Sequence, residues 1–358
     1  MTASDFGGGA WRQFCDGLLG AGAHILDDDF ARTDFERAEG LRYLTRLTRI
    51  ALEMNLENAD PAFPAFYQAS HETAKIGADN PDNVYLNATI SGGFKYRISG
   101  TRGDAPIFSI GTKANRYAID GTMASTGELD GRDIQFSPEG DFEVIVAKER
   151  EGTNWLPLAE DSSMLLLRQT FFDRPHSTPA QVQVECLNGP TKQAPLTPDS
   201  LSKSLNAVPA FVSGTAQTFK TWATSFRTNN FNRLNTVDQT LFFRAGGDPS
   251  IYYLHGWWEL KEGEALRIRA TPPACEGWNF QLNNIWMESL DYRHASVHTN
   301  NELAAYNDDG SVTVVVSPED IGAENWLNTG AHRRGTMLWR WTGADEHPIP
   351  ETEIISAP

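Results

Sequence analysis

The spacing of apolar residues predicts helices in the first part of the chain. Over residues 8–26 the apolar positions recur at steps of three and four, which places them on one helical face. Thr33 and Glu36 then have the spacing of a capping box, and an apolar face of helical period continues from there to about residue 56. The segment 61–77 contains two prolines and is expected to hold a third, shorter helix.

From residue 82 the pattern changes to that of strands. Short β-branched or alternating runs are separated by Gly, Asp and Pro, which is typical of an antiparallel sandwich. Around residues 196–245 the pattern is helical again, with one helix expected from Pro198 and another over Phe219 to Phe226. A second strand-rich block follows from about residue 248 to residue 355.

The two strand-rich blocks resemble each other in sequence. Four landmarks recur in the same order with offsets that grow only from 168 to 172 residues. They are Tyr85-Leu86 with Tyr253-Leu254, Arg97-Ile98 with Arg267-Ile268, the NWL triplets at Asn154 and Asn325, and Arg168 with Arg340. We therefore predict a mainly β protein with two tandem homologous β-sandwich units, jelly-roll-like in type. The expected parts are a helical arm (1–78), a first sandwich (79–195), a helical connector (196–245) and a second sandwich (246–358).

Composition and charge narrow the class of protein. The formal net charge of −17 argues against nucleic acid or an anionic membrane as partner, because both would repel the chain. The three cysteines form no CxxC pair, the first residues lack a basic and apolar leader pattern, and no apolar run is long enough to span a bilayer. We therefore expect a cytoplasmic protein. Motifs for serine hydrolases, phosphate loops, dinucleotide binding and HExxH metalloproteases are missing from the sequence.

The second block differs from the first in its aromatic and charged residues. Seven of the ten tryptophans lie at or after Trp257, and the stretch after the second NWL supplies His332 with Arg333 and Arg334. The NWL triplet itself occurs in both blocks, so a structural role is favoured for Asn325 and Trp326. Residues unique to the second block are better candidates for function.

Three stretches of the second block, WNFQLNNIWMESLDYRHASVHTN, NDDGSVTVVVSPEDIGAENWL and GAHRRGTMLWRW, resemble a family called domain of unknown function 1214. The resemblance covers about the last hundred residues. It departs from the family pattern where Ala331 separates Gly330 from His332, and where Asn328 replaces an acidic residue. The resemblance implies a β-sandwich, often beside a second related domain, and brings no established reaction. The positions that match are Trp286, Glu288, Asp291, Tyr292, Arg293, Asn325, Trp326, Leu327, His332, Gly335, Arg340 and Trp341.

Candidate chemistry gathers in the same region. If residues 279–290 form one strand, Trp286 and Glu288 share a face, and residues 291–294 lie at its end. Glu288, Asp291 and His332 are the candidate catalytic acids and bases. The candidate substrate-binding residues are Trp258, His255, Trp286, Tyr292, Arg293, His294, Asn325, Trp326 and Arg340.

Each of these assignments has a structural alternative. The carboxylates and histidines could instead form ion pairs with nearby arginines, and the tryptophans could fill a core. His294 and His298 with Glu288 could in principle hold a metal, but their spacing matches no strong metal motif, so no metal is predicted.

Two functional hypotheses remain. The first is a cytoplasmic hydrolase or lyase that acts on a small ring-containing molecule, such as a glycoside, steroid or phenolic, by acid–base chemistry without an organic cofactor. The second is a non-catalytic protein that binds a small molecule or assembles into a homo-oligomer.

Overall fold

The computed structural model describes residues 3–357, with side chains from residue 8 onward. The described chain forms two compact units, each assembled from more than one segment. The first unit comprises 3–74, 82–216 and 244–246, and the second comprises 75–81, 217–243 and 247–357.

Two helices begin the first unit: α1 (Ala3–Ile25) and α2 (Asp34–Leu52), the latter ending in a short π-helical turn, η1 (Glu53–Glu57). The predicted capping box is confirmed at the start of α2. The hydroxyl of Thr33 accepts a hydrogen bond from the Glu36 N–H at 3.1 Å, and the Glu36 carboxylate accepts one from the Thr33 N–H at 3.1 Å.

The expected third helix is not formed. Residues 58–75 are turns and isolated bridges, because Pro61 and Pro64 cannot donate helical hydrogen bonds. Tyr67 instead pairs with Asn87, with N–H to O distances of 2.9 and 2.7 Å. This segment therefore lies beside the first sandwich rather than continuing the helical arm.

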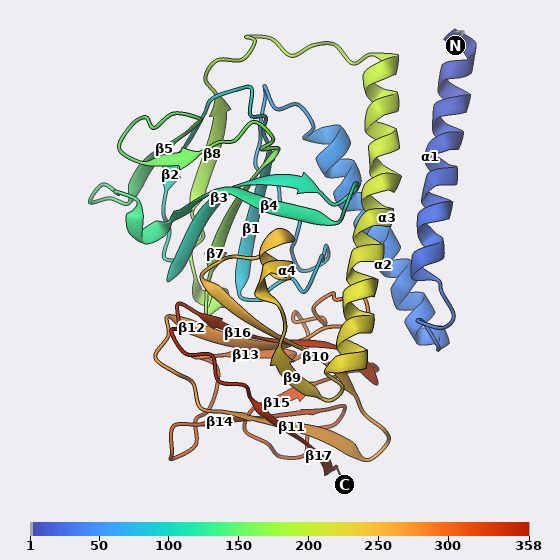
Figure 1. Cartoon of the computed structure of the whole chain (residues 1–358), viewed down its shortest axis with the longest axis vertical. Helices are drawn as coiled ribbons and strands as arrows, with labels where there is room; N and C mark the ends of the chain where they lie inside the picture. Colours follow the sequence, from blue (N-terminus) through green and yellow to red (C-terminus); the bar gives the residue numbers. More distant parts are fainter. Residues whose placement is uncertain (1–2, 358) are drawn as a thin grey trace. The chain divides into compact units, whose positions relative to one another are not determined.

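The first unit contains a sandwich of two four-stranded sheets (Figure 1). The inward faces of the two sheets form one hydrophobic core. One sheet has the order β1-β7-β3-β4, built from β1 (Asn83–Thr89), β7 (Met164–Thr170), β3 (Ile107–Arg116) and β4 (Thr122–Asp130). The other has the order β6-β5-β2-β8, built from β6 (Trp155–Pro157), β5 (Asp141–Ala147), β2 (Tyr96–Thr101) and β8 (Gln181–Cys186). Single 3-10 turns occur at η2 (Gly131–Asp133) and η3 (Arg174–His176).

The second unit contains a sandwich of the same kind. One sheet has the order β10-β16-β12-β13, built from β10 (Ile251–Glu259), β16 (Arg334–Thr342), β12 (Gly277–Leu282) and β13 (His298–Asn300). The other has the order β15-β14-β11-β17, built from β15 (Trp326–Asn328), β14 (Val312–Ser317), β11 (Glu264–Ala270) and β17 (Glu351–Ser356). The short strand β9 (Arg233–Thr236) belongs to this unit as well.

Strand order and register show that the two sandwiches are copies of one plan. Tyr85 lies opposite Arg168 across β1 and β7, and Tyr253 lies opposite Arg340 across β10 and β16. Each copy also has one parallel pair, β5 with β6 and β14 with β15, among otherwise antiparallel strands. The prediction of two tandem similar β-sandwiches is confirmed, and the landmark residues align the copies position by position.

The helical connector differs from expectation in one respect. A single helix, α3 (Pro198–Asn229), replaces the two expected helices and continues through Pro209. Its residues up to 216 belong to the first unit and those from 217 to the second. The short helix α4 (Gln239–Arg244) follows.

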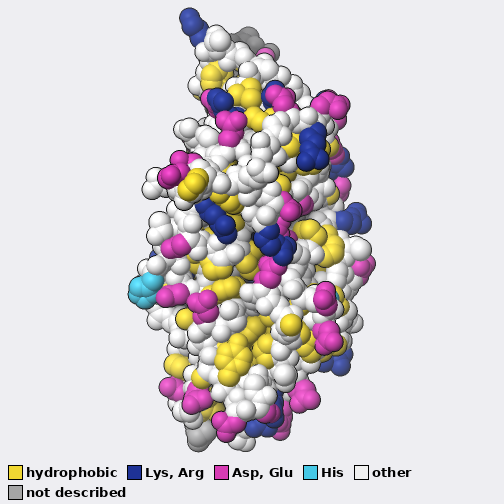
Figure 2. Space-filling view, turned by 90° about the vertical axis from the view of Figure 1, so that its left-hand side faces the viewer, with side chains coloured by type: hydrophobic (Ala, Val, Ile, Leu, Met, Phe, Trp, Pro, Cys, Tyr) yellow, Lys and Arg dark blue, Asp and Glu magenta, His cyan; other side chains and the backbone are white. Residues whose placement is uncertain are grey.

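Two further observations concern membrane-spanning helices and the distribution of surface charge. Among the described residues, no helix is both long enough and apolar enough to cross a membrane. The face shown in Figure 2 carries acidic and basic side chains interspersed, with no large area of one sign.

Candidate functional site

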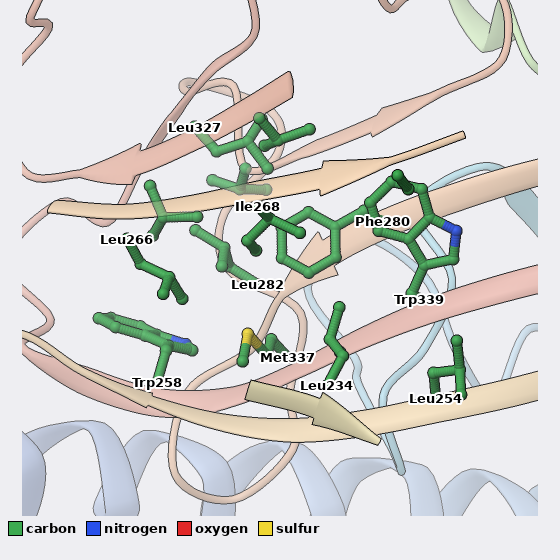
Figure 3. Packing of buried hydrophobic residues seen from close by; sticks show 14 of the residues in the cluster. Leu234, Leu254, Trp258, Leu266, Ile268, Phe280, Leu282, Leu327, Met337 and Trp339 are labelled. Carbon is green, nitrogen blue, oxygen red and sulfur yellow. The ribbon is translucent and has the colours of Figure 1, made fainter. Parts of the chain in front are cut away.

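The tryptophans of the second sandwich fill its core. Trp278 and Trp339 stack with ring centres 4.9 Å apart and planes 12° from parallel. Trp258 is fully buried and donates its indole N–H to the Thr336 carbonyl at 3.1 Å. Figure 3 shows Trp258 and Trp339 packed among aliphatic side chains of this core. Trp258, predicted to contact a ligand, therefore serves as packing in this structure.

The segment that carries Glu288 is a loop, and the expected long strand is wrong. Strand β12 ends at Leu282, and the chain then turns through Met287, whose φ of 61° is incompatible with a continuing strand. Asn284 organises this loop: its Oδ1 accepts hydrogen bonds from the N–H groups of Trp286 (3.0 Å) and Glu288 (3.1 Å). Its Nδ2 donates to the Glu288 carboxylate at 2.8 Å. Trp286 and Glu288 are both buried within the loop rather than displayed along a strand face.

Gly335 on strand β16 packs directly against the backbone at the start of the loop that carries Glu288. A Cβ added there would lie 2.0 Å from the Asn283 carbonyl oxygen, which is far inside contact distance. Only glycine lets strand β16 approach the start of the loop so closely.

Arg340 is buried on the face of the sheet that points away from the core. Its guanidinium donates to the side-chain oxygens of Asn279 and Gln281 and to the Ala78 carbonyl, the last at 2.6 Å. The backbone of residues 75–81 is thereby bound to strands β12 and β16 of its own unit. Arg340 thus holds this segment in place, a role that its sequence position did not indicate.

Two more buried groups hold the segment 75–81. The Asp79 carboxylate accepts hydrogen bonds from the Ser289 N–H (3.0 Å) and hydroxyl (2.8 Å). Lys75 donates its ammonium protons to the carbonyls of Ser289 (2.6 Å) and Leu290 (2.9 Å). Charged groups buried with this many partners are typical of a structural network.

Asp291 forms an ion pair with Arg293. Two hydrogen bonds of 2.8 and 2.6 Å join the guanidinium to the carboxylate. These bonds hold the pKa of Asp291 well below its usual value, against the opposing effect of partial burial. A carboxylate with so low a pKa is a poor base near neutral pH, which argues against its predicted catalytic role.

The other candidate residues near this loop, Tyr292, His294 and His332, differ in their contacts and in their exposure to solvent. Tyr292 lies under the Lys75 ammonium, 4.7 Å from ring centre to nitrogen, and its ring is 6.2 Å from that of His298. His294 is exposed. His332 is half-buried, and its backbone N–H donates to the Thr329 carbonyl at 3.1 Å. Among the side chains that the structure describes, no three His, Cys, Asp or Glu groups are arranged to hold a metal ion.

His255 lies in an aromatic enclosure. Its ring stacks on Phe226 and lies against Phe242, with ring centres 4.6 Å away in both cases. Burial first, and the charge of Arg340 second, lower the pKa of His255 well below its usual value. The imidazole is therefore neutral in the folded protein, and its buried Nδ1 has no hydrogen-bond partner.

Asn325 and Trp326 have the same structural role as their counterparts in the first sandwich. The Asn325 amide bonds backbone groups of Ala305 and Thr313, and the Asn154 amide bonds those of Gln135 and Glu143. Both indoles also donate to a carbonyl of the neighbouring strand, as expected for a feature that the fold requires in each copy.

A pocket is present in the first sandwich, where no site was predicted. It has a volume of about 300 Å³ and lies at the end of the sandwich where β1 begins and β7 ends. Its lining is mixed, with aliphatic and aromatic groups beside one charged pair, and all of it belongs to the first unit. The lining residues are Gln68, Glu72, Val84, Leu86, Gln169, Phe171, Arg174, Ser177, Pro179 and Ala180.

Gln169 is the most unusual member of this lining. It is fully buried, and its Oε1 accepts a hydrogen bond from the Ala180 N–H at 2.6 Å. Since an N–H can only donate, this bond fixes the orientation of the amide. The Nε2 group then points elsewhere; it has almost no surface that a water-sized probe reaches and no hydrogen-bond partner within the described chain. Such orphaned donors are rare in folded proteins and call for an explanation.

The second sandwich fills the equivalent position. The pair Val84 and Gln169 faces across β1 and β7, and its counterpart across β10 and β16 is Tyr252 and Trp341. Trp341 is fully buried and donates its indole N–H to the Pro348 carbonyl at 3.0 Å. Smaller side chains at the same two positions leave the first sandwich hollow.

The sequence contained a signal for this pocket. The inward positions of β7 are Leu165, Leu167 and Gln169, and an amide at the last of them breaks an otherwise apolar series. The corresponding positions of β16 are occupied by Met337, Trp339 and Trp341. Comparing the two copies position by position would have identified Gln169.

Comparisons with known proteins agree with this architecture. Residues 261–346 match a family described as "Protein of unknown function (DUF1214)". A crystal structure of an uncharacterised protein from Burkholderia cenocepacia is 45% identical, covers 99% of each chain and superposes with a TM-score of 0.95. The VPA0106 protein from Vibrio parahaemolyticus, 12% identical with a TM-score of 0.51 over 94% of this chain and 100% of its own, shares the fold. No curated protein matches the sequence.

The fold thus defines a protein of two tandem β-sandwiches. Its second sandwich contains the region, residues 261–346, that matches the DUF1214 family. The predicted family resemblance is confirmed.

Proposed function

We propose that this protein binds a small molecule without transforming it, and that the pocket of the first sandwich is the binding site. The observation that carries the proposal is the buried, unpartnered Nε2 of Gln169 in the pocket lining. A ligand that accepts a hydrogen bond there would satisfy a donor that the chain leaves unpaired.

The form of the pocket supports the proposal. A volume of about 300 Å³ is within the range of small-molecule sites, which are usually apolar with a few directed polar groups. Val84 and Leu86 lie on the inward-facing side of β1 yet remain only partly buried, because the space before them is empty. The pocket opens to solvent, since Gln68 and Pro179 of its lining are exposed, so a ligand can enter it.

The catalytic alternative receives less support from the geometry. Glu288 is fully buried and hydrogen-bonded to Asn284. Asp291 forms an ion pair with Arg293. A general base needs a lone pair that can reach the substrate, and neither carboxylate is presented in that way. Binding without turnover is therefore the function that this arrangement fits best.

The test is a thermal-shift screen of small molecules against the wild type and Gln169→Trp. The substitution places in the pocket the side chain that fills the second sandwich. A ligand present at 100 times its Kd stabilises the folded state by about 2.7 kcal/mol, which is readily detected. We expect hits to raise the Tm of the wild type and to lose this effect in Gln169→Trp. Hits that stabilise both proteins equally would contradict the proposed site.

A control variant accounts for the added indole. Gln183 lies on β8 with an exposed side chain, outside the pocket lining. Gln183→Trp adds the same group at the surface, and ligand-induced shifts in this variant should equal those of the wild type.

A further inference from the structure

We infer that the ligand of this pocket is an uncharged carbonyl compound with a compact hydrocarbon body. This inference rests on the proposed binding function of the pocket and specifies the chemical class of its ligand. It is derived from three features of the lining: the direction of the Gln169 amide, the lack of charge around that amide, and the apolar walls.

The fixed orientation of Gln169 determines the polarity of the hydrogen bond. Its oxygen is engaged by the Ala180 N–H at 2.6 Å, so only Nε2 is left to pair with a ligand. Because Nε2 lies just beneath the surface of the pocket, with almost no area that a water-sized probe reaches, a ligand pairs with it by displacing part of the lining. Nε2 donates and cannot accept. The ligand atom that pairs with it is therefore an acceptor, such as the oxygen of a ketone, aldehyde, ester, lactone or amide.

Burial at this point excludes a charged acceptor. Gln169 and Phe171 are among the most buried residues of the lining, with exposed fractions of 0% and 1%. A carboxylate placed beside them would lose most of its hydration and gain one bond from a neutral amide, which does not offset that loss. A neutral carbonyl oxygen loses much less hydration free energy on burial, and a single hydrogen-bond donor satisfies it.

The charged pair in the lining does not change this conclusion. Arg174 donates to Glu72 at 2.7 Å, and both side chains keep partial exposure, 23% and 38%. The pair is thus nearer to solvent than Gln169, and the charges of its two members offset each other. An anionic ligand would gain little from Arg174 while Glu72 is beside it.

The apolar walls define the rest of the ligand. Val84, Leu86, Phe171, Pro179 and Ala180 provide hydrocarbon surface around the amide. A ligand that buries a ring or short chain against these groups gains free energy in proportion to the apolar area removed from water. A rigid aryl or cyclic ketone fits this combination of one acceptor and an apolar body.

The experiment uses three probes of similar shape: acetophenone, cumene and benzoate. Acetophenone presents a neutral carbonyl, cumene replaces that carbonyl by a hydrocarbon branch, and benzoate replaces it by a carboxylate. Affinities for the full-length protein are obtained from NMR titrations at concentrations below the solubility of cumene. We expect acetophenone to bind about tenfold more tightly than cumene, since one buried hydrogen bond separates them. Benzoate should bind most weakly.

The Gln169→Met variant keeps nearly the same volume and removes the Nε2 donor, together with the Oε1 that accepts from the Ala180 N–H. We expect the preference for acetophenone over cumene to fall to about one, while the affinity for cumene is retained. The matched control, Gln183→Met, changes an exposed glutamine and should keep the wild-type preference. Circular dichroism and Tm establish that both variants are folded. If Gln169→Met fails to fold, the order of the three probes in the wild type still decides the matter.

Two results would overturn the inference. Equal binding of acetophenone and cumene, or tighter binding of benzoate, would show that the ligand class is wrong while the proposed binding function stands. No binding of acetophenone at all would also overturn it. The proposed function is rejected separately, by screen hits that stabilise the wild type and Gln169→Trp alike.

Discussion

Gln169 occupies in the first sandwich the strand position that Trp341 occupies in the second. Both lie on the inward face of the strand that pairs with β1 or β10, in matching register. The indole is packed and its N–H is bonded, whereas the amide borders a hollow and its Nε2 is unpaired. The two copies of one scaffold therefore differ at this end, which is filled in the second sandwich and open in the first.

Gln169→Trp should change the stability of the ligand-free protein only slightly, because two effects oppose each other. The new indole would fill empty space, which commonly adds about 0.5–2 kcal/mol to the free energy of unfolding. It cannot accept the hydrogen bond that Gln169 accepts from the buried Ala180 N–H, and an unsatisfied buried donor costs about 1–3 kcal/mol. Urea denaturation monitored by circular dichroism measures the net change. A loss of more than about 3 kcal/mol would indicate overpacking and would mean that the hollow is smaller than described.

Trp341→Gln should have the opposite effect on the second sandwich. Removing a fully buried indole leaves a cavity and an unpaired Pro348 carbonyl, so we expect a loss of about 3–5 kcal/mol. The same urea experiment measures it. Trp11→Gln is the control, because that tryptophan is 59% exposed and its replacement should change stability by no more than about 0.5 kcal/mol. Equal effects of the two substitutions would contradict the packing role of Trp341.

Asn284→Ala should destabilise the loop that carries Glu288. The substitution removes an acceptor for two backbone N–H groups and a donor to the Glu288 carboxylate, all of them buried. We expect a loss of about 2–4 kcal/mol, since buried groups left without partners are costly. Asn328→Ala, which removes one bond to the Gly330 N–H at a partly exposed site, should have a much smaller effect. Comparable losses for the two variants would contradict the structural role of Asn284.

His255→Phe should make stability less dependent on pH. Folding lowers the pKa of His255 below its usual 6.5, so the unfolded state binds a proton that the folded state does not. Stability in the wild type therefore decreases as pH falls below 6.5, by up to about 1.4 kcal/mol per pH unit from this group. The phenylalanine variant lacks this contribution.

Urea midpoints between pH 7.5 and about pH 5 test this prediction, because His255 changes its protonation within that range on unfolding. The difference between wild type and variant should increase in favour of the variant as the pH falls. His294→Gln, at an exposed position, serves as the control. Parallel pH profiles for wild type and His255→Phe would show that His255 is not kept neutral by its aromatic enclosure.

Much of the fold could be predicted from the sequence. The capping box at Thr33 and Glu36 and the repeated landmarks, among them Arg168 and Arg340, depend on local spacing and order, which the chain displays directly. The predicted third helix over 61–77 does not form, because Pro61 and Pro64 interrupt the helical hydrogen bonds that its spacing of apolar residues would otherwise favour. The expected long strand over 279–290 was wrong because the residue in the left-handed conformation, Met287, is neither a glycine nor an asparagine, which usually mark such a position.

The candidate site was harder to predict for a physical reason. A ring-lined cavity and an aromatic core have the same composition and the same alternation along a strand, so tryptophan content could not distinguish them. The structure uses Trp258 and Trp339 as core. The pocket arises instead where a large side chain is missing, at Val84 and Gln169. Amino-acid composition reports which side chains the chain contains, whereas this pocket depends on the lack of a large side chain at two particular positions.

The most direct test of the central claim observes the side chain of Gln169 itself. Its Nε2 resonance can be assigned in 15N-labelled protein by its loss in Gln169→Met, and acetophenone can then be added in steps. Formation of a hydrogen bond to a donor that now has no partner should shift this resonance in proportion to the bound fraction. If the signal stays in place while acetophenone shifts resonances elsewhere, the open end of the first sandwich is not the binding site.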